Sequence, residues 1–216
     1  MSPAPTIDQL LVADPPERWR EAGFQAEGDL CVVGTVRLRL GNAGRGIVGW
    51  SLRGASTLDL DGLPTTASTH PPPPASAEPH PNGAIAIDHV VAFTPDLDRT
   101  TATLRTAGLD LRRLREEPTP GGAPRQAFFR LGDVILEVVQ APEGTRIAED
   151  PTGPARLWGI SFLVEDLEPT VSTLGDLLGE PRAAVQPGRE IATLRKEAGL
   201  GPAVAFMTGG PGGITV

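Results

Sequence analysis

The hydrophobic and polar positions of the chain follow one plan three times, namely an apolar strand, a turn and an amphipathic helix. The plan occurs at residues 6–24, 85–109 and 157–180. Each copy opens with an apolar run typical of a buried strand and closes its helix at a glycine. The sequence therefore predicts an internal repeat, and the size of each copy is that of a supersecondary module.

The helix of the second copy is predicted from the spacing of its apolar residues. The stripe recurs about every 3.6 residues and consists of Leu97, Thr101, Leu104 and Ala107. Gly108 follows as a helix stop. The third copy shows the same spacing over residues 167–178, before Gly179. Both segments are therefore expected to lie with one face against a sheet.

Short β-like runs follow each predicted helix. They are residues 30–41 and 46–54 in the first copy, 125–133 and 134–140 in the second, and 189–196 and 203–208 in the third. Each copy is thus a βαβββ module, and one such module cannot bury its own sheet. We predict an α+β fold of paired βαβββ modules that form a half-closed, cupped β-barrel.

The domain limits follow from a change in composition. Residues 63–83 include four consecutive prolines among Ser, Thr and Ala, so we expect an extended or mobile linker without ladder hydrogen bonds. A truncated module then occupies 1–62, and a domain of two modules (84–142 and 155–208) occupies 84–216. His70 and His80 lie in the linker, which leaves His89 as the histidine of the folded part.

His89 and Glu137 are the candidates for chemistry. Strand alternation places Ile87, His89 and Val91 on one face of a strand and Asp88 on the other. Glu137 lies among branched aliphatic residues, where an unpaired carboxylate is costly to bury. His89 is its candidate partner. The alternative is a buried hydrogen-bonded pair with a structural role and no catalysis.

Tandem βαβββ modules with "DHVV" and "PDLD" at 88–98 and "LEVV" at 136–139 resemble the vicinal oxygen chelate superfamily, which contains glyoxalase I, bleomycin-resistance proteins and extradiol dioxygenases. The resemblance implies a divalent metal held by a His of a module's first strand and a Glu of its last strand. His89 and Glu137 match these positions. It also implies proton transfer of the lyase, isomerase or epimerase type, with His89 as metal anchor or base and Glu137 as second ligand or proton carrier.

The second half of such a metal site is missing from the sequence. Gly159 aligns with His89, and residues 203–208 offer no acid opposite Glu137; the first module has Gln9 and Trp50 near the two positions. Tight zinc, nickel or iron sites normally use three or four protein ligands, so the set is incomplete. One alternative completes it: the second modules of two chains pair across a two-fold axis and share a His₂Glu₂ site in a homodimer.

Three further residues are expected at a ligand. Arg189 follows the Pro187-Gly188 turn and can bind a carboxylate or phosphate with two parallel hydrogen bonds at the cavity rim, unless it is a solvated hairpin arginine. Arg130 and Gln126 share a strand face, so both are candidates for substrate binding. An outward, exposed Arg130 is the open alternative.

Composition excludes several classes of partner. The formal charge is −8, which argues against a nucleic-acid partner and against an anionic membrane surface. One cysteine, Cys31, leaves no intrachain disulfide and points to a reducing cytoplasm. The chain opens without a secretion signal and has no apolar run of roughly 18 residues, the length that a membrane span needs.

We therefore expect a glyoxalase-like protein that binds a small polar organic molecule in a cupped sheet and transforms it by metal-assisted proton transfer. Two alternatives stay open at this point. One is a metal-free protein that sequesters a small molecule, as in the bleomycin-resistance branch. The other is a structural or dimerisation module without catalysis.

Overall fold

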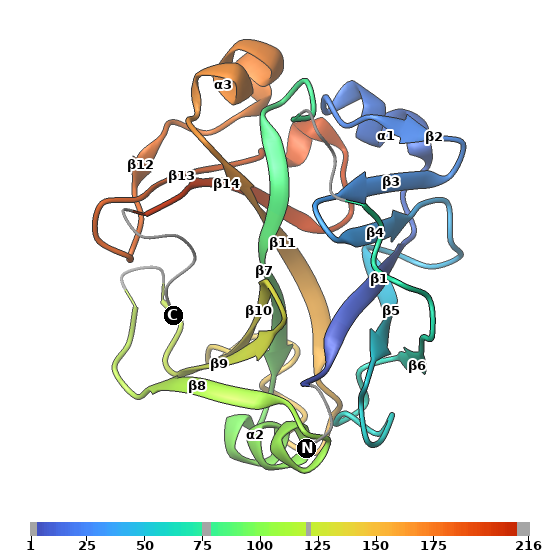
Figure 1. Ribbon diagram of the computed structural model, residues 1–216. Helices are drawn as coiled ribbons and strands as arrows, with labels where there is room; N and C mark the ends of the chain where they lie inside the picture. Colours follow the sequence, from blue (N-terminus) through green and yellow to red (C-terminus); the bar gives the residue numbers. More distant parts are fainter. Residues whose placement is uncertain (1–3, 75–78, 120–121, 211–216) are drawn as a thin grey trace.

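Two curved β-sheets form the architecture (Figure 1). The structure is a computed structural model that describes residues 4–74, 79–119 and 122–210. One sheet has eight strands and holds the second and third copies of the repeat, and the other has six strands and holds the first.

The eight-stranded sheet has the order β12-β13-β14-β11-β7-β10-β9-β8. Its strands are β7 (Ala84–Thr94), β8 (Asp110–Arg115), β9 (Gln126–Leu131), β10 (Val134–Gln140), β11 (Arg156–Val164), β12 (Arg182–Ala183), β13 (Glu190–Thr193) and β14 (Ala203–Thr208). Its helices are α2 (Leu97–Thr106) and α3 (Glu168–Leu174), with 3₁₀ turns at Gly175–Leu177 and Lys196–Ala198.

Strand pairing in this sheet shows two βαβββ modules joined through their first strands. In each module the first strand pairs in parallel with the last, β7 with β10 and β11 with β14. The two first strands, β7 and β11, pair antiparallel with each other. The predicted α+β fold of paired modules with a cupped sheet is therefore confirmed.

The six-stranded sheet has the order β2-β3-β4-β1-β5-β6. Its elements are β1 (Thr6–Val12), α1 (Pro16–Glu21), β2 (Ala26–Glu27), β3 (Leu30–Val33), β4 (Val36–Arg39), β5 (Ile47–Arg53) and β6 (Thr65–Ala67). β4 is parallel to β1, as β10 is to β7, so β1 to β4 with α1 complete one module.

β5 therefore does not close the first module, as residues 46–54 were expected to do. It lies antiparallel to β1, in the place that a partner module's first strand would take. The position equivalent to Glu137 is Arg39 in β4, not Trp50, because Gln9 is in register with Arg37 as His89 is with Ile135. The prediction failed because an apolar run bounded by glycines has the same pattern whether it closes its own module or pairs antiparallel with the module's first strand.

The predicted linker is docked in part. Thr65–Ala67 forms β6 and pairs in parallel with β5, so the expectation that 63–83 makes no ladder hydrogen bonds is wrong there. Asp8, buried in β1, accepts hydrogen bonds from Ser68, Arg37 and Arg53. Residues 75–78 lie outside the described residues, and the domain limits at 63–83 stay a prediction.

His80 also belongs to the folded part, contrary to expectation. Its side chain is buried, its Nδ1 accepts a hydrogen bond from the Gln25 amide at 3.0 Å, and its Nε2 lies 3.1 Å from the Val32 carbonyl oxygen. Burial lowers the pKa of His80 below its ordinary value, more than the contact with Val32 raises it. His89 is therefore one of two histidines held in the folded structure.

The two sheets share one hydrophobic core. An aromatic cluster joins them: Phe24, after α1, lies between Trp19 at 4.9 Å and Phe162 of β11 at 4.7 Å, measured between ring centroids. Phe206 of β14 lies 6.1 Å from Phe24. Such ring pairs add to the free energy of burial, so the first module is covered by the other two, as its apolar face requires.

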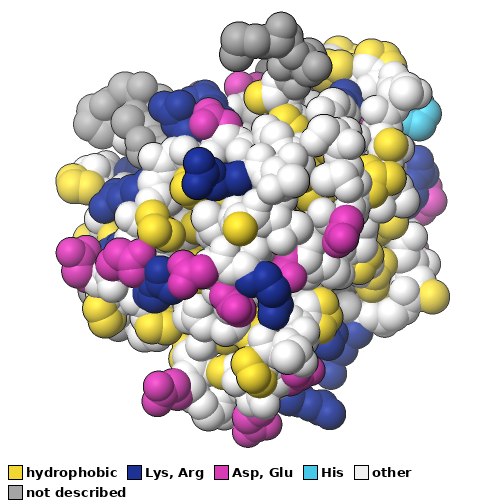
Figure 2. Space-filling view, turned by 90° about the horizontal axis from the view of Figure 1, so that it is seen from below, with side chains coloured by type: hydrophobic (Ala, Val, Ile, Leu, Met, Phe, Trp, Pro, Cys, Tyr) yellow, Lys and Arg dark blue, Asp and Glu magenta, His cyan; other side chains and the backbone are white. Residues whose placement is uncertain are grey.

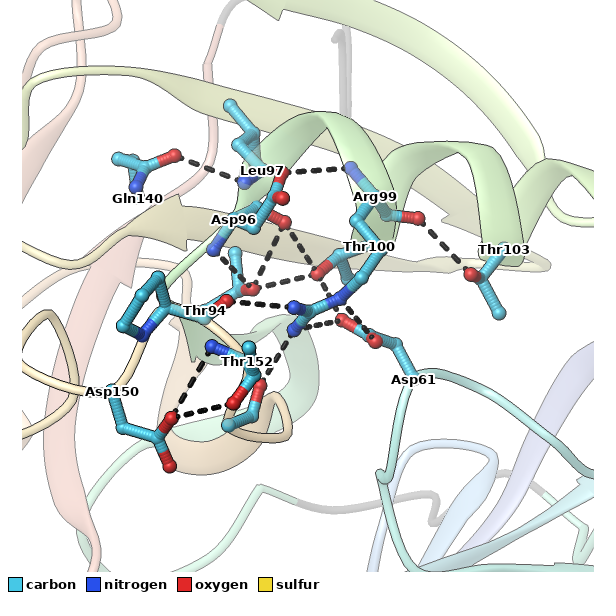
Figure 3. Close-up of polar contacts among 12 residues, drawn as sticks. Asp61, Thr94, Asp96, Leu97, Arg99, Thr100, Thr103, Gln140, Asp150 and Thr152 are labelled. Atoms are coloured by element: carbon cyan, nitrogen blue, oxygen red, sulfur yellow. Dashed lines mark hydrogen bonds and ion pairs between the residues drawn. The ribbon is translucent and has the colours of Figure 1, made fainter.

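A polar network ties the loop after β5 to the start of α2 (Figure 3). Asp61 accepts hydrogen bonds from Arg99 Nε at 2.8 Å and Nη2 at 3.2 Å, and from the Thr100 hydroxyl. Arg99 also donates to the Pro151 and Gly153 carbonyls. Three segments far apart in sequence therefore meet at one arginine.

Charges are interspersed on the face of the molecule seen in Figure 2, where acidic and basic side chains alternate between small hydrophobic areas. This face presents no continuous basic patch. Among the described residues, no helix is long and apolar enough to cross a membrane.

The Asp61 network yields a prediction about stability. Asp61 has a φ of 56°, which asparagine tolerates, so Asp61→Asn removes the charge without straining the backbone. It should lower the free energy of unfolding by about 1–3 kcal/mol, because the Arg99 guanidinium is left without its carboxylate. Urea unfolding of both proteins measures the difference.

Asp59→Asn is the matched control, since Asp59 is exposed two residues away on the same loop. It should change the free energy of unfolding by less than about 0.5 kcal/mol. Equal losses in the two variants would contradict the role given to Asp61.

Candidate functional site

The cup of the eight-stranded sheet holds a cavity of about 740 Å³. Four of the five predicted site residues line it: His89, Gln126, Glu137 and Arg189. They come from both modules, so the cavity requires the pairing of β7 with β11.

His89 and Glu137 meet at the floor of the cavity. β7 and β10 are adjacent, and His89 Nε2 lies 3.5 Å from Glu137 Oε2. Their side chains are 13% and 15% exposed. Gln126 in β9 donates its amide to Glu137 Oε1. Both side chains therefore face one cavity.

Asp88 is the residue that the sequence analysis placed wrongly. β7 shifts register against β11 between Ile87 and His89, which marks a β-bulge at Asp88. Alternation is broken there, so Ile87 lies in the core and Asp88 turns toward His89, with Oδ2 2.7 Å from His89 Nδ1. A bulge has no clear signal in a continuous apolar run, so the pattern could not show it.

Arg189 lies deeper than expected. It is 7% exposed, its Nε donates to the Thr208 carbonyl at 2.6 Å, and its Nη2 donates to Asp88 Oδ1. It is therefore neither a solvated hairpin arginine nor a free group at the rim, because its guanidinium holds Asp88. Sequence spacing could not reveal this contact, since Arg189 and Asp88 belong to different modules.

Arg130 does not join the site. Its side chain is exposed, its Nε donates to the Gly132 carbonyl at 3.0 Å, and it does not line the cavity. Residues 126, 128 and 130 do alternate to one face of β9, but the strand carries Arg130 beyond the cavity's edge. Arg130 therefore points outward and is exposed, which is the alternative left open by the sequence.

Alternating charges follow one another at the floor of the cavity: Arg189, His89 and Glu137 line it, and Asp88 pairs with both Arg189 and His89. Burial lowers the pKa of His89, but the hydrogen bond with Asp88 and the charge of Glu137 outweigh it, so the pKa lies above its ordinary value. Burial raises the pKa of Asp88, yet contacts with His89 and Arg189 bring it below its ordinary value. The site therefore favours a charged imidazolium beside a charged carboxylate.

Two buried polar atoms close to the pair have no hydrogen-bond partner among the described residues: Gln126 Oε1 and Ser161 Oγ. Ser161 is the register partner of His89 in β11. Buried polar atoms are normally satisfied, and unsatisfied ones are often found where water or a ligand binds. Ser161 is not among the predicted site residues, because serine in an apolar strand carries no distinctive signal.

The residues present do not make a protein-only site for a tightly bound divalent metal. His89 and Glu137 supply two ligands, and within the described ranges no group of three or more His, Cys, Asp or Glu side chains gathers. Gln126 directs its amide nitrogen to Glu137, and its Oε1 is buried. Asp88 is already paired with Arg189 and His89.

The third module cannot restore the missing ligand at Gly159. A Cβ at this position would lie 2.8 Å from the Ala203 carbonyl oxygen, closer than side chains come to backbone. The shared His₂Glu₂ alternative is not the arrangement that this chain shows. It needs the second modules of two chains to pair, whereas β7 pairs with β11 of the same chain.

Comparison with known proteins gives similar solved structures but no match at the level of sequence. No protein-family model matches the sequence, and no curated protein matches it. Among solved structures, methylmalonyl-CoA epimerase from Mycobacterium tuberculosis is 18% identical, with 60% of this chain and 91% of that chain covered and a TM-score of 0.49. A hypothetical protein from Bacillus halodurans is 18% identical, with coverage of 56% and 92% and a TM-score of 0.45.

A variant of Streptomyces coelicolor methylmalonyl-CoA epimerase in complex with 2-nitronate-propionyl-CoA is 20% identical, with coverage of 62% and 99% and a TM-score of 0.48. At identities and TM-scores this low, the description of the fold rests on the strand pairing above, and the function proposed below rests on the geometry of the site.

The Asp88–His89 contact yields a prediction about protonation. Asp88→Asn removes the carboxylate that accepts from His89 Nδ1, so the pKa of His89 should fall. Titration of the histidine ring protons by NMR measures the change, and His89→Gln assigns the signal.

His80 is the internal control, because its pKa is set by burial in the first module, away from Asp88. Its titration should be the same in both proteins. A His89 midpoint that is unchanged in Asp88→Asn would show that the 2.7 Å contact does not govern its protonation.

A second prediction concerns stability and pH. The folded-state pKa of His89 lies above its unfolded value of about 6.5, so its contribution is complete below that pH and is lost as pH rises through the folded-state value. The stability advantage of the wild type over His89→Gln should therefore shrink as the pH rises above about 6.5. Urea unfolding across this range measures it, and an advantage that grew with pH would contradict the assignment.

Proposed function

We propose that this protein binds a small organic molecule in the cup of the eight-stranded sheet and moves a proton to or from it, in a reaction of the isomerase, epimerase or lyase type. The observation that carries the proposal is the His89–Glu137 pair at the cavity floor, with Nε2 and Oε2 3.5 Å apart. A carboxylate and an imidazole in one enclosed cavity are the groups that proton transfer uses.

Asp88 and Gln126 fix the geometry of this pair. Asp88 accepts from His89 Nδ1, which directs Nε2 toward Glu137 and the cavity. Gln126 holds the other oxygen of Glu137 by an amide hydrogen bond. Both reacting side chains are thus held by neighbours rather than by solvent, which is the condition for an oriented acid and base.

The proton moves as follows in this proposal. Glu137 takes a proton from a carbon next to a carbonyl group, the C–H bond breaks, and its electron pair moves into the carbonyl to form an enolate. The Nε2–H of the His89 imidazolium donates a hydrogen bond to the enolate oxygen. Glu137 then returns the proton to the same face of the carbon, or to the other face after the enolate has turned in the cavity. In an elimination, the enolate pair instead forms a C=C bond, a leaving group departs from the next carbon with its bonding electrons, and Glu137 gives the proton to the leaving group or to water.

The cavity wall supports this chemistry. Phe128, Ile191 and Met207 line it beside the polar floor. Apolar walls reduce the water around the reacting groups, and charges interact more strongly where water is excluded. The wall can also contact the carbon skeleton of a ligand.

A metal-free binding protein is the second candidate. It is favoured by the incomplete ligand set and by the commitment of Asp88 to Arg189 and His89, which leaves two protein ligands for a metal. Binding without turnover would then be the whole function, and the His89–Glu137 pair would only recognise a polar group.

Hydrogen exchange at carbon tests the proposed reaction. The protein is incubated in D₂O with a panel of 2-oxo acids and acyl thioesters, and deuterium uptake is followed by mass spectrometry. Glu137→Gln keeps the shape and removes the base, so exchange of the responding compound should fall by about 100-fold or more. His89→Gln should reduce it as well, and the double variant should show a non-additive loss.

Glu117→Gln is the matched control, since Glu117 lines the cavity but is not part of the pair. It should leave exchange within about threefold of the wild type, as a charge without a role in the proton transfer would. Exchange that survives in both Glu137→Gln and His89→Gln would overturn the proposal. Binding of a panel compound without any exchange would favour the second candidate.

The same assay tests whether a metal ion takes part in the proton transfer. Exchange is measured in the presence of a chelator and after addition of Mg²⁺ or Mn²⁺, the ions that a site with few protein ligands can hold. Activity that survives chelation assigns the proton transfer to the side chains alone.

A further inference from the structure

The mouth of the cavity carries arginines from both ends of the eight-stranded sheet. Arg113 lies in β8 and Arg182 in β12, the two edge strands, and both line the same cavity. Arg115 in β8 lines it as well. Figure 1 shows β8 and β12 on the same side of the molecule, because the sheet curves. Residues from opposite edges therefore face one opening.

This rim is positive in an acidic protein. Among the described residues that line the cavity, four are arginines and two are glutamates, whereas the chain as a whole carries a charge of −8. Arg189 is paired with Asp88. In the described part of the chain, no ion pair includes Arg113, Arg115 or Arg182. A concave surface lined by one sign of charge concentrates ligands of the other sign.

We propose that the rim binds the carboxylate or phosphate of an organic anion whose remaining part reaches His89 and Glu137. Guanidinium groups bind these acids through paired, charge-assisted hydrogen bonds. Arginines that approach from two strands can hold one acidic group from both sides. This proposal gives a substrate class for the proposed function. That the anion is a substrate rests on the proposed function, whereas the binding of the anion to the rim does not.

The rim and the floor of the cavity offer a ligand two different environments. Arg113 and Arg182 are exposed, whereas His89 and Glu137 are largely buried at the floor. Phe128, Ile191 and Met207 lie along the wall. The expected ligand therefore has an acidic group for the rim and an apolar or carbonyl-bearing part for the interior.

Three simple probes test the rim without requiring a reaction. Phenylacetate carries a carboxylate, phenyl phosphate carries a phosphate, and phenylacetamide is the neutral counterpart. Binding to the full chain is measured by calorimetry at low ionic strength, where charge-assisted contacts are least screened. At least one anion should bind about tenfold or more tightly than the amide, since each such contact is worth more than a neutral hydrogen bond.

The variants Arg113→Gln and Arg182→Gln should each weaken the binding of the anion by about threefold to tenfold, and the double variant should weaken it further. Arg112→Gln is the matched control, because Arg112 is exposed on β8, pairs with Asp110 and does not line the cavity. It should bind the anion as the wild type does.

The outcomes separate this inference from the proposed function. Preference for one anion assigns the acid as carboxylate or phosphate, and equal binding of both supports a general anion rim. Amide binding as tight as that of the anions, no binding of either anion, or anion binding unchanged in the double variant would each overturn the rim. Deuterium exchange that depends on Glu137 would still support the proton transfer in those cases.

Discussion

A carboxylate buried in an apolar sheet must be paired, and Asp88 is paired twice. It accepts from Arg189 on one oxygen and faces His89 Nδ1 on the other. A single buried charge without a partner would cost about several kcal/mol. The bulge in β7, which buries Asp88, therefore depends on these contacts. The orientation of His89, and through it the geometry at Glu137, depends on this one carboxylate.

The first module also has a buried, paired aspartate at a bulge in its first strand. Asp8 follows an isoleucine in β1 as Asp88 does in β7, and β1 shifts register at the same place. Contacts with Ser68, Arg53 and Arg37 outweigh burial and lower the pKa of Asp8. The residue after Asp8 is a glutamine, and part of the expected linker lies against the sheet here. The first and second modules thus both have a buried aspartate paired with arginine. Of these two modules, only the second has a histidine after it.

The two ends of the cavity differ in what holds them. The floor is built from the central strands β7 and β10, where His89 and Glu137 are constrained by neighbours and by the core behind them, while Arg189, just before β13, holds Asp88. The rim is built from edge strands, where Arg113 and Arg182 are exposed. This arrangement suits a site that must hold its reacting groups rigidly and still admit a charged ligand from water.

Periodicity along the chain was enough to predict the repeated modules and their helices. The meeting of His89 with Glu137 was expected from the cost of burying an unpaired carboxylate and from the resemblance to the vicinal oxygen chelate superfamily, which implies that the first and last strands of a module border one pocket. Local pattern could not assign β5 to its antiparallel place beside β1, since an apolar run has the same pattern in either pairing. Nor could it place His80 in the core, or Asp88 and Arg189 together, because a bulge and a contact between modules depend on the register of distant strands. The candidate catalytic pair was therefore determined by sequence, whereas the charges that orient it and the arginines at its mouth were decided by the way the modules close on each other.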